Sequence, residues 1–136
     1  MKYLLDTNIC VFVIRQKPLV VVEKFKQFVA DELAISSVTL AELRYGADKS
    51  SDTGKNHAAL DLFLAPLAIV DFDSQAAERY GVVRADLERR GLPIGPLDTM
   101  IAAHALRLVI PLVTNNTREF ARVGGLLLED WASKVT

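Results

Sequence analysis

The chain has 136 residues, of which 51% are hydrophobic, and its formal net charge is −1 at pH 7. Its length predicts a single domain over residues 1–136, and its balanced charge excludes a generally basic nucleic-acid binder. A single cysteine excludes an internal disulfide and a cysteine-based zinc site. No apolar stretch suits a membrane span or a signal peptide, so we expect a cytoplasmic protein with no membrane partner.

The start of the chain predicts one strand and two helices. We expect residues 3–5 to form a short buried strand and residues 8–14 a helix, for which Thr7 is a suitable N-cap. Pro18 favours the first turn of a second helix, because its fixed φ suits that position. Asp6 then lies directly at the end of the first strand.

The next segment repeats the strand-then-helix pattern. Residues 33–35 predict a second strand, and residues 38–45 predict a helix that Gly46 ends. Residues 48–55 are polar and typical of a loop. A further helix follows, with an apolar face formed by Leu60, Phe63 and Leu64.

The pattern continues with a third strand over residues 67–70. Asp73 or Ser74 caps a long helix, which Gly91 ends. Another helix begins at Pro96.

The end of the chain predicts two more strands, over residues 109–114 and 126–128, the first of them interrupted by Pro111. Short apolar strands that alternate with helices predict an α/β fold, in which helices flank both faces of a short, mainly parallel central sheet. In such folds ligands bind beyond the carboxyl ends of the strands.

Acidic or amide side chains occur at four predicted strand ends or helix starts. Asp6 follows the first strand, Glu42 lies in the helix after the second, and Asp98 lies in the first turn of the Pro96 helix. Asn116 and Glu119 follow the fourth strand. These residues are too far apart in sequence for a local motif, so only the tertiary fold could bring them together.

Each acid also has an ordinary structural explanation. Glu42 could be the solvent-facing residue of its helix, and Asp98 could favour the positive end of a helix dipole. Asp6 could cap the helix that follows it. Cys10 is expected to be a small buried residue, His57 to be solvated and His104 to be a packed or partly exposed helix residue.

Several carboxylates at one end of a sheet would repel one another unless a divalent cation lay between them. Mg²⁺ and Mn²⁺ prefer oxygen ligands, and such ions support phosphodiester cleavage. The sequence contains no motif of a serine hydrolase, a P-loop or a dinucleotide-binding fold. Acids without a histidine or cysteine set therefore favour metal-dependent phosphodiester chemistry.

Four stretches resemble the PIN-domain family, in particular the VapC-type toxins of bacterial toxin–antitoxin pairs. They are LLDTNICVF (4–12), ISSVTLAELRYGADKS (35–50), RRGLPIGPLDTMIAAHAL (89–106) and LVTNNTREFARVGGLLLEDW (112–131). Together they span nearly the whole chain. The resemblance implies a three-layer PIN-like fold and an endoribonuclease that depends on Mg²⁺ or Mn²⁺.

The resemblance also implies roles for individual residues. Asp6, Glu42 and Asp98 match the acids that hold the metal. Asn116 replaces a fourth acid that is frequent in the family, and Glu119 is expected to supply the missing charge. The hydroxyl groups of two threonines are expected to support the acids by hydrogen bonds: Thr7 and Thr114.

The implied substrate is structured RNA, with tRNA and initiator tRNA as the expectation. The RNA backbone contacts are expected to come from Arg44, Lys49, Arg84, Arg89, Arg90 and Arg118. The mixed charge around residues 84–90 is equally typical of an ordinary solvated helix face.

The implied partners are a cognate VapB-type antitoxin and a second copy of the chain, assembled as a homodimer and as a larger hetero-oligomer with antitoxin. Five apolar residues could line an antitoxin groove or pack in the core: Phe12, Val13, Val20, Phe25 and Phe28.

Two other functions compete with a toxin nuclease. A phosphatase that forms an aspartyl phosphate would place a second aspartate where this chain has Asn8. A binding module that had lost catalysis would not be expected to keep Asp6, Glu42 and Asp98.

Overall fold

The computed structural model describes residues 1–132, and the strands of this part form one sheet in which every neighbouring pair is parallel. The strand order is β3-β2-β1-β4-β5, so the first strand of the chain lies at the centre. The strands are β1 (Tyr3–Leu5), β2 (Leu33–Ser36), β3 (Ala68–Val70), β4 (Leu112–Val113) and β5 (Leu128–Glu129). The predicted α/β class with a short parallel sheet is therefore confirmed.

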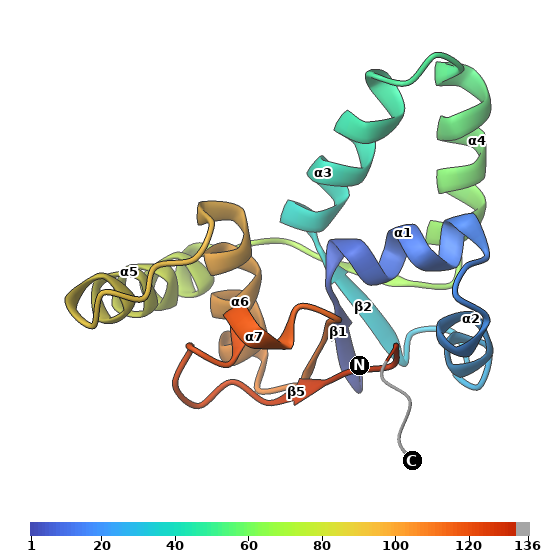
Figure 1. Ribbon diagram of the computed structural model, residues 1–136. Coiled ribbons are helices and arrows are strands. Elements are labelled where there is room, and N and C mark those ends of the chain that lie inside the picture. Colours follow the sequence, from blue (N-terminus) through green and yellow to red (C-terminus); the bar gives the residue numbers. More distant parts are fainter. Residues whose placement is uncertain (133–136) are drawn as a thin grey trace.

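Seven helices occur in the described part of the chain. They are α1 (Thr7–Arg15), α2 (Leu19–Phe25), α3 (Ser37–Asp48), α4 (Thr53–Leu64), α5 (Ser74–Arg89), α6 (Pro96–Leu108) and α7 (Thr117–Phe120). Figure 1 shows α1 and α2 on one side of the sheet, with α5, α6 and α7 on the other. None of these helices is long and apolar enough to cross a bilayer.

Each face of the sheet is covered by its own apolar cluster. Leu5 and Ile35 pack with residues of α1, α2 and α4, whereas Leu4 and Ala34 pack with residues of α5 and α6. Successive side chains of a strand point to opposite faces, so strands buried on both faces are apolar throughout. The result is the expected arrangement of helices, sheet and helices.

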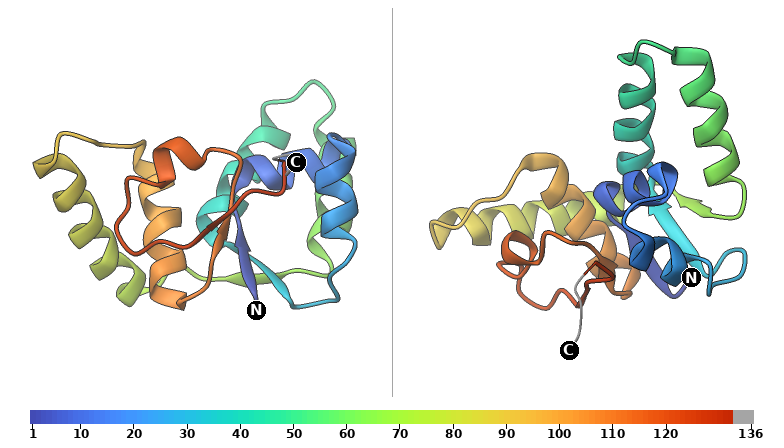
Figure 2. Two further views of the ribbon diagram at one scale, coloured as in Figure 1. Left: turned by 60° about the horizontal axis from the view of Figure 1, so that its bottom comes forward. Right: turned by 45° about the vertical axis from the view of Figure 1, so that its right-hand side comes forward.

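Helices α3 and α4 form an antiparallel pair that extends away from the sheet (Figures 1 and 2). Arg44 donates to Oδ1 of Asp61 at 2.7 Å and to Nδ1 of His57 at 3.0 Å. Nε2 of His57 lies 2.7 Å from Oδ1 of Asp48. Because arginine only donates, His57 accepts at Nδ1 and donates from Nε2. The side chain of His57 stays partly exposed, at 27%, and its ring also links the two helices, which was not predicted.

Several predicted element boundaries were wrong. Asp6, not Thr7, is the N-cap of α1, and Pro18 is the N-cap of α2 rather than part of its first turn. Helix α3 continues through Gly46. Strand β4 is shorter than predicted because Val109 ends α6 in a left-handed conformation with φ 57°.

Candidate active site

Asp6 lies at the carboxyl end of the central strand β1 and is only 3% exposed. Its Oδ1 accepts the backbone N–H of Thr7 at 2.7 Å, and its Oδ2 accepts the hydroxyl of Thr114 at 2.8 Å. Burial raises the pKa of this carboxyl, while the two hydrogen bonds oppose the rise. The fold therefore holds the carboxylate in a fixed orientation.

Thr7 connects Asp6 to Glu42. Its N–H bonds to Asp6, and its hydroxyl donates to Oε1 of Glu42 at 2.7 Å. The Thr7 hydroxyl has only one proton, which it donates to Glu42. The Thr39 hydroxyl, whose Oγ1 lies 3.2 Å from that of Thr7, therefore donates to Thr7. Glu42 is half-buried, and this network shows that it is not simply a solvent-facing residue of α3.

Asp98 is half-buried in the first turn of α6. Burial is the largest cause that raises its pKa to about 6, and the negative charges of Asp6, Glu42 and Glu119 raise it further. No group within residues 1–132 donates a hydrogen bond to this carboxylate. The structure thus brings four acids from four different elements close enough to repel one another.

Asn116 and Glu119 lie beside this group, at the start of α7. Nδ2 of Asn116 donates to Oε2 of Glu119 at 3.0 Å. The backbone N–H of Asn116 donates to the hydroxyl of Thr114 at 3.0 Å, and that hydroxyl donates to Asp6. The loop after β4 therefore orients Asp6 through Thr114 and orients Glu119 through the Asn116 amide.

The donor atoms of this site suit a hard divalent cation. All of them are oxygens, and the unbalanced charge at Asp98 would be offset by a cation between Asp6, Glu42 and Asp98. Within residues 1–132, no three acidic, histidine or cysteine side chains are already gathered as a complete ligand set. Mg²⁺ usually binds through one or two carboxylates and keeps several waters, so the site fits such an ion.

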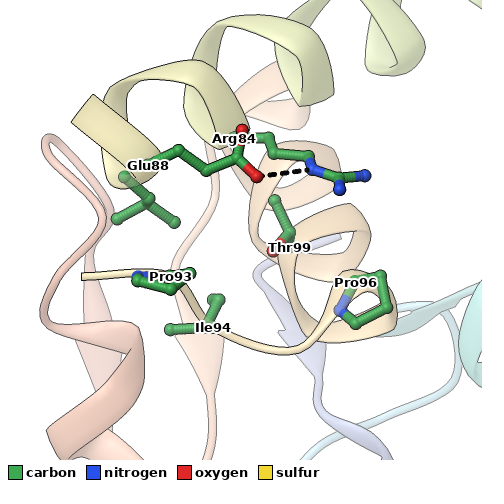
Figure 3. A pocket seen from close by; sticks show the side chains of 7 residues that line it. Arg84, Glu88, Pro93, Ile94, Pro96 and Thr99 are labelled. Atoms are coloured by element: carbon green, nitrogen blue, oxygen red, sulfur yellow. Dashed lines mark hydrogen bonds and ion pairs between the residues drawn. The ribbon is translucent and has the colours of Figure 1, made fainter. Parts of the chain in front are cut away.

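Arg84 of α5 borders a small pocket of about 150 Å³, which Pro96 and Thr99 line from the start of α6 (Figure 3). Its Nε lies 3.4 Å from Oε2 of Glu88, and its Nη1 donates to the hydroxyl of Tyr80 at 2.8 Å. These bonds run along α5 itself. Arg84 therefore lies next to the turn that carries the third acid, with its charge already partly balanced.

The other predicted RNA contacts are spread over several elements. Arg44 pairs with Asp61 and His57 of α4, and Arg90, the C-cap of α5, pairs with Asp86 of that helix. Arg89 and Arg118 are exposed and form no ion pair in the described part of the chain. Lys49 lies close to the acids, because it lines two clefts together with Glu42.

These two clefts lie on either side of α3. The cleft toward α1 and α4 is lined by Thr7, Glu42 and Lys49, and also by Arg15 at the end of α1. Arg15 was not among the predicted RNA contacts. In the sequence, Arg15 appears only as a cation in the last turn of a predicted helix. Such a cation is typical of a residue that stabilises the helix dipole, so it does not by itself indicate an RNA contact.

The apolar residues considered for an antitoxin groove lie mostly against the core. Phe25 stacks on Phe63, with ring centroids 5.6 Å apart, and Phe28 stacks on Trp131 at 5.4 Å. Phe12 and Val13 pack in the apolar cluster that also contains Phe25 and Phe28. Val20 lies at the surface and is 43% exposed.

Comparison with known proteins gives close and consistent matches. Residues 3–126 match the PIN domain family. The chain is 49% identical over 132 residues to the tRNA(fMet)-specific endonuclease VapC of Shigella flexneri, covering 97% of this chain and 99% of the relative.

Two crystal structures share the fold over nearly their full length. A chain in the DNA-bound VapBC of Salmonella typhimurium superposes with a TM-score of 0.92 and 45% identity, covering 97% of this chain and 99% of that one. A chain in VapBC2 of Rickettsia felis, bound to a DNA fragment from its promoter, gives a TM-score of 0.88 and 42% identity, with 96% and 99% covered.

The parallel sheet, with acids gathered beyond the end of its central strand, and the match over residues 3–126 define the class: the chain belongs to the PIN-domain family. Within this family, its identity to VapC over nearly the full length of both chains places it among the VapC-type proteins.

Proposed function

We propose that this protein is a VapC-type toxin, an endoribonuclease that cleaves structured RNA and that a VapB-type antitoxin neutralises in the cytoplasm. The observation that carries the proposal is the group of acids around Asp98: burial first, and then the charges of these acids, raise its pKa to about 6. Acids in such numbers, with no cation of residues 1–132 at hydrogen-bonding distance from Asp98, suit Mg²⁺ or Mn²⁺ and a phosphodiester substrate.

The metal would be held by Asp6, Glu42 and Asp98. When bound, it supplies positive charge for the phosphate and lowers the pKa of a bound water. Asp6 is the fixed ligand, because both of its oxygens are already oriented by hydrogen bonds from Thr7 and Thr114. These two threonines determine where the remaining lone pairs of Asp6 point.

Glu42 orients the attacking water in this mechanism. Its Oε1 is held by Thr7, while its Oε2 accepts no hydrogen bond from residues 1–132 and is free for the water. The water oxygen attacks phosphorus in line, and the bond to the 3′ oxygen breaks. The products carry a 5′-phosphate and a 3′-hydroxyl. Asn116 holds Glu119 beside Asp98, where the extra negative charge strengthens cation binding.

The substrate that we propose is tRNA, and initiator tRNA in particular, because the Shigella flexneri relative is named as a tRNA(fMet)-specific endonuclease. The partner proposals follow the solved VapBC complexes. We propose that the chain forms a homodimer, and that one or more antitoxin chains join it in a larger complex.

The direct test is cleavage of total tRNA by the purified chain with Mg²⁺. Wild type should cleave initiator tRNA, and Asp98→Asn should lower the rate on the order of 10²-fold or more, as is usual when a charge-stabilising group is lost. Asp98→Asn suits this test because it removes a repelled charge, so a folding defect would not explain its inactivity.

Two controls complete the test. Asp86→Asn, which changes an acid of α5 that pairs with Arg90, should cleave normally. Asp6→Asn should be inactive, and only the active forms should arrest bacterial growth when the antitoxin is absent. Equal RNA integrity after incubation with wild type and with Asp98→Asn would overturn the nuclease proposal.

A further inference from the structure

An apolar cleft of about 640 Å³ adjoins the acids on the side of α3 that faces α6. Thr7 and Glu42 line one part of it, so the cleft is continuous with the acidic site. Most of its remaining surface is apolar and comes from α3 and from the first turns of α6. Tyr45, Leu97 and Met100 contribute the large side chains.

Tyr45 is 64% exposed, and its hydroxyl has no hydrogen-bond partner within residues 1–132. The ammonium of Lys49 lies 5.1 Å from the centroid of its ring. Leu97, across the cleft, is 46% exposed. Exposed apolar groups that are gathered beside an active site are typical of a binding surface.

Tyr45 lies one helical turn from Glu42, because residues three apart on a helix are neighbours on its surface. A group that stacks on the ring would therefore be one nucleotide, or less, from a phosphate bound at the acids. Among residues 1–132, the only charged residues that line the cleft are Glu42 and Lys49, and their charges cancel. An uncharged, planar and largely apolar group fits this lining.

We propose that this cleft binds one nucleobase of the RNA substrate, stacked on Tyr45 beside the scissile phosphate. The inference rests on the proposed nuclease function and extends it to a specific contact. An exposed aromatic ring is a sequence-tolerant platform, since every base has a π-face. Lys49 places a positive charge beside the ring, where it attracts the phosphate of the stacked nucleotide.

The cleft on the opposite side of α3 has different chemistry. It is smaller, about 350 Å³, and its lining includes Arg15, Ser50 and Asn56 in addition to Lys49. Polar and cationic groups suit a phosphate backbone or a peptide better than a base. The contrast between the two clefts is the reason for assigning the base to the Tyr45 side.

A base held in this way must be unstacked from its neighbours in the RNA. Unstacked bases occur in loops, bulges and single-stranded ends, whereas stacking covers the faces of the bases in an A-form duplex. The Tyr45 cleft therefore selects loop phosphodiesters of a structured RNA over those in its stems. This selection requires no base-specific hydrogen bond.

The test combines protein and RNA variants after the cleavage position has been mapped on tRNA. Stem–loop RNAs carrying that position are made with single abasic nucleotides on either side of it. Tyr45→Ala should lower kcat/KM by roughly 5- to 150-fold, which corresponds to the 1–3 kcal/mol of one base stacked on an aromatic ring. Tyr45→Phe should keep activity within about threefold, because the ring is retained.

For the wild-type protein, an abasic nucleotide at one position should lower kcat/KM by a similar factor. With that RNA, Tyr45→Ala should lower kcat/KM little further. Such non-additivity identifies the pair in contact. The control Leu62→Ala removes a side chain of α4 that is 79% exposed. It should change kcat/KM neither for the intact RNA nor for the abasic RNA. Sedimentation of each variant gives its oligomeric state under the assay conditions.

Three results would overturn the proposal. In the first, the factors by which Tyr45→Ala and the abasic nucleotide lower kcat/KM multiply at every position, which means that the two changes act independently and no base contacts the ring. Tyr45→Ala could convert a dimer to monomers, which would assign the cleft to a second copy of the chain. If wild type cleaves no RNA, the nuclease function fails together with this contact, whereas normal cleavage without coupling removes the contact alone.

Discussion

Replacing Asp98 with asparagine should stabilise the metal-free protein. The carboxylate is half-buried, and burial with three nearby acids raises its pKa from 3.8 to about 6. A shift of about two units corresponds to about 3 kcal/mol, at 1.36 kcal/mol per unit. Because water screens part of the repulsion, we expect a gain of about 1.5–3 kcal/mol in the free energy of unfolding.

The pH dependence of this gain follows from the direction of the shift. Between pH 3.8 and about 6 the folded state holds the Asp98 proton more tightly than the unfolded state does. The free energy of unfolding of wild type therefore falls as the pH rises through this window. The advantage of Asp98→Asn should be full at pH 7.5 and about half as large at pH 5.

Thermal denaturation in EDTA measures both effects. For a chain of this length, the expected gain raises Tm by about 5–10 °C at pH 7.5. The control Asp86→Asn should change the free energy of unfolding by no more than about 0.5 kcal/mol. The reasoning is refuted if Asp98→Asn is no more stable than wild type at pH 7.5, or if its advantage is the same at pH 5. Added Mg²⁺ should narrow the difference, since it binds the folded wild type.

Three further predictions concern hydrogen bonds made by α3 or by the residues that cap it. Thr7→Val removes the hydroxyl that holds Glu42 and should lower kcat for RNA cleavage by about 10- to 100-fold, whereas Thr7→Ser should retain most of the activity. Ser36→Ala should lower the free energy of unfolding in urea by about 1–3 kcal/mol, because it removes the side-chain cap of α3 and the partner of His104. Arg44→Ala should lower stability by at most about 1 kcal/mol and leave cleavage unchanged; a large loss of RNA affinity would instead support its assignment as an RNA contact.

The gathering of the acids could be predicted from the sequence because it depends on simple features. A buried strand that Asp6 directly follows and a helix that begins two residues before Asp98 both place carboxylates at the same edge of a parallel sheet. His104 was expected to be packed or partly exposed, and it is buried, with Nδ1 2.8 Å from Oγ of Ser36. These features are carried by apolar patterning and turn residues, which act locally.

Gly46 shows why the boundaries were harder to predict. Glycine often ends helices because it adopts positive φ at little cost, yet α3 continues for two residues beyond it. Ala47, the residue directly after Gly46, is buried. Its burial and the pairing of α3 with α4 offset the cost of about 1 kcal/mol for a glycine inside a helix. That packing is tertiary and leaves no local signal.

The cations were the least predictable part of the candidate site. Arg44 was expected to contact RNA because it follows Glu42 closely in sequence, but its side chain turns to α4 and pairs with Asp61. Arg15, which is 27 residues before Glu42 in sequence, lines the same cleft as Glu42. The direction of a long side chain depends on which neighbouring helix supplies its partner, and this is fixed only when the helices pack.

The acids differ in how much support the fold gives them. Asp6 accepts two hydrogen bonds and Glu42 accepts one, whereas Asp98 accepts none from residues 1–132. Repulsion from Asp6, Glu42 and Glu119 therefore acts on a carboxylate that no hydrogen bond from this part of the chain offsets, and together with burial it raises the pKa of Asp98 to about 6. A neutral residue at this position would make the protein more stable. A fold that keeps a charge where stability favours its loss is expected when the charge serves a ligand, here a cation with its RNA phosphate.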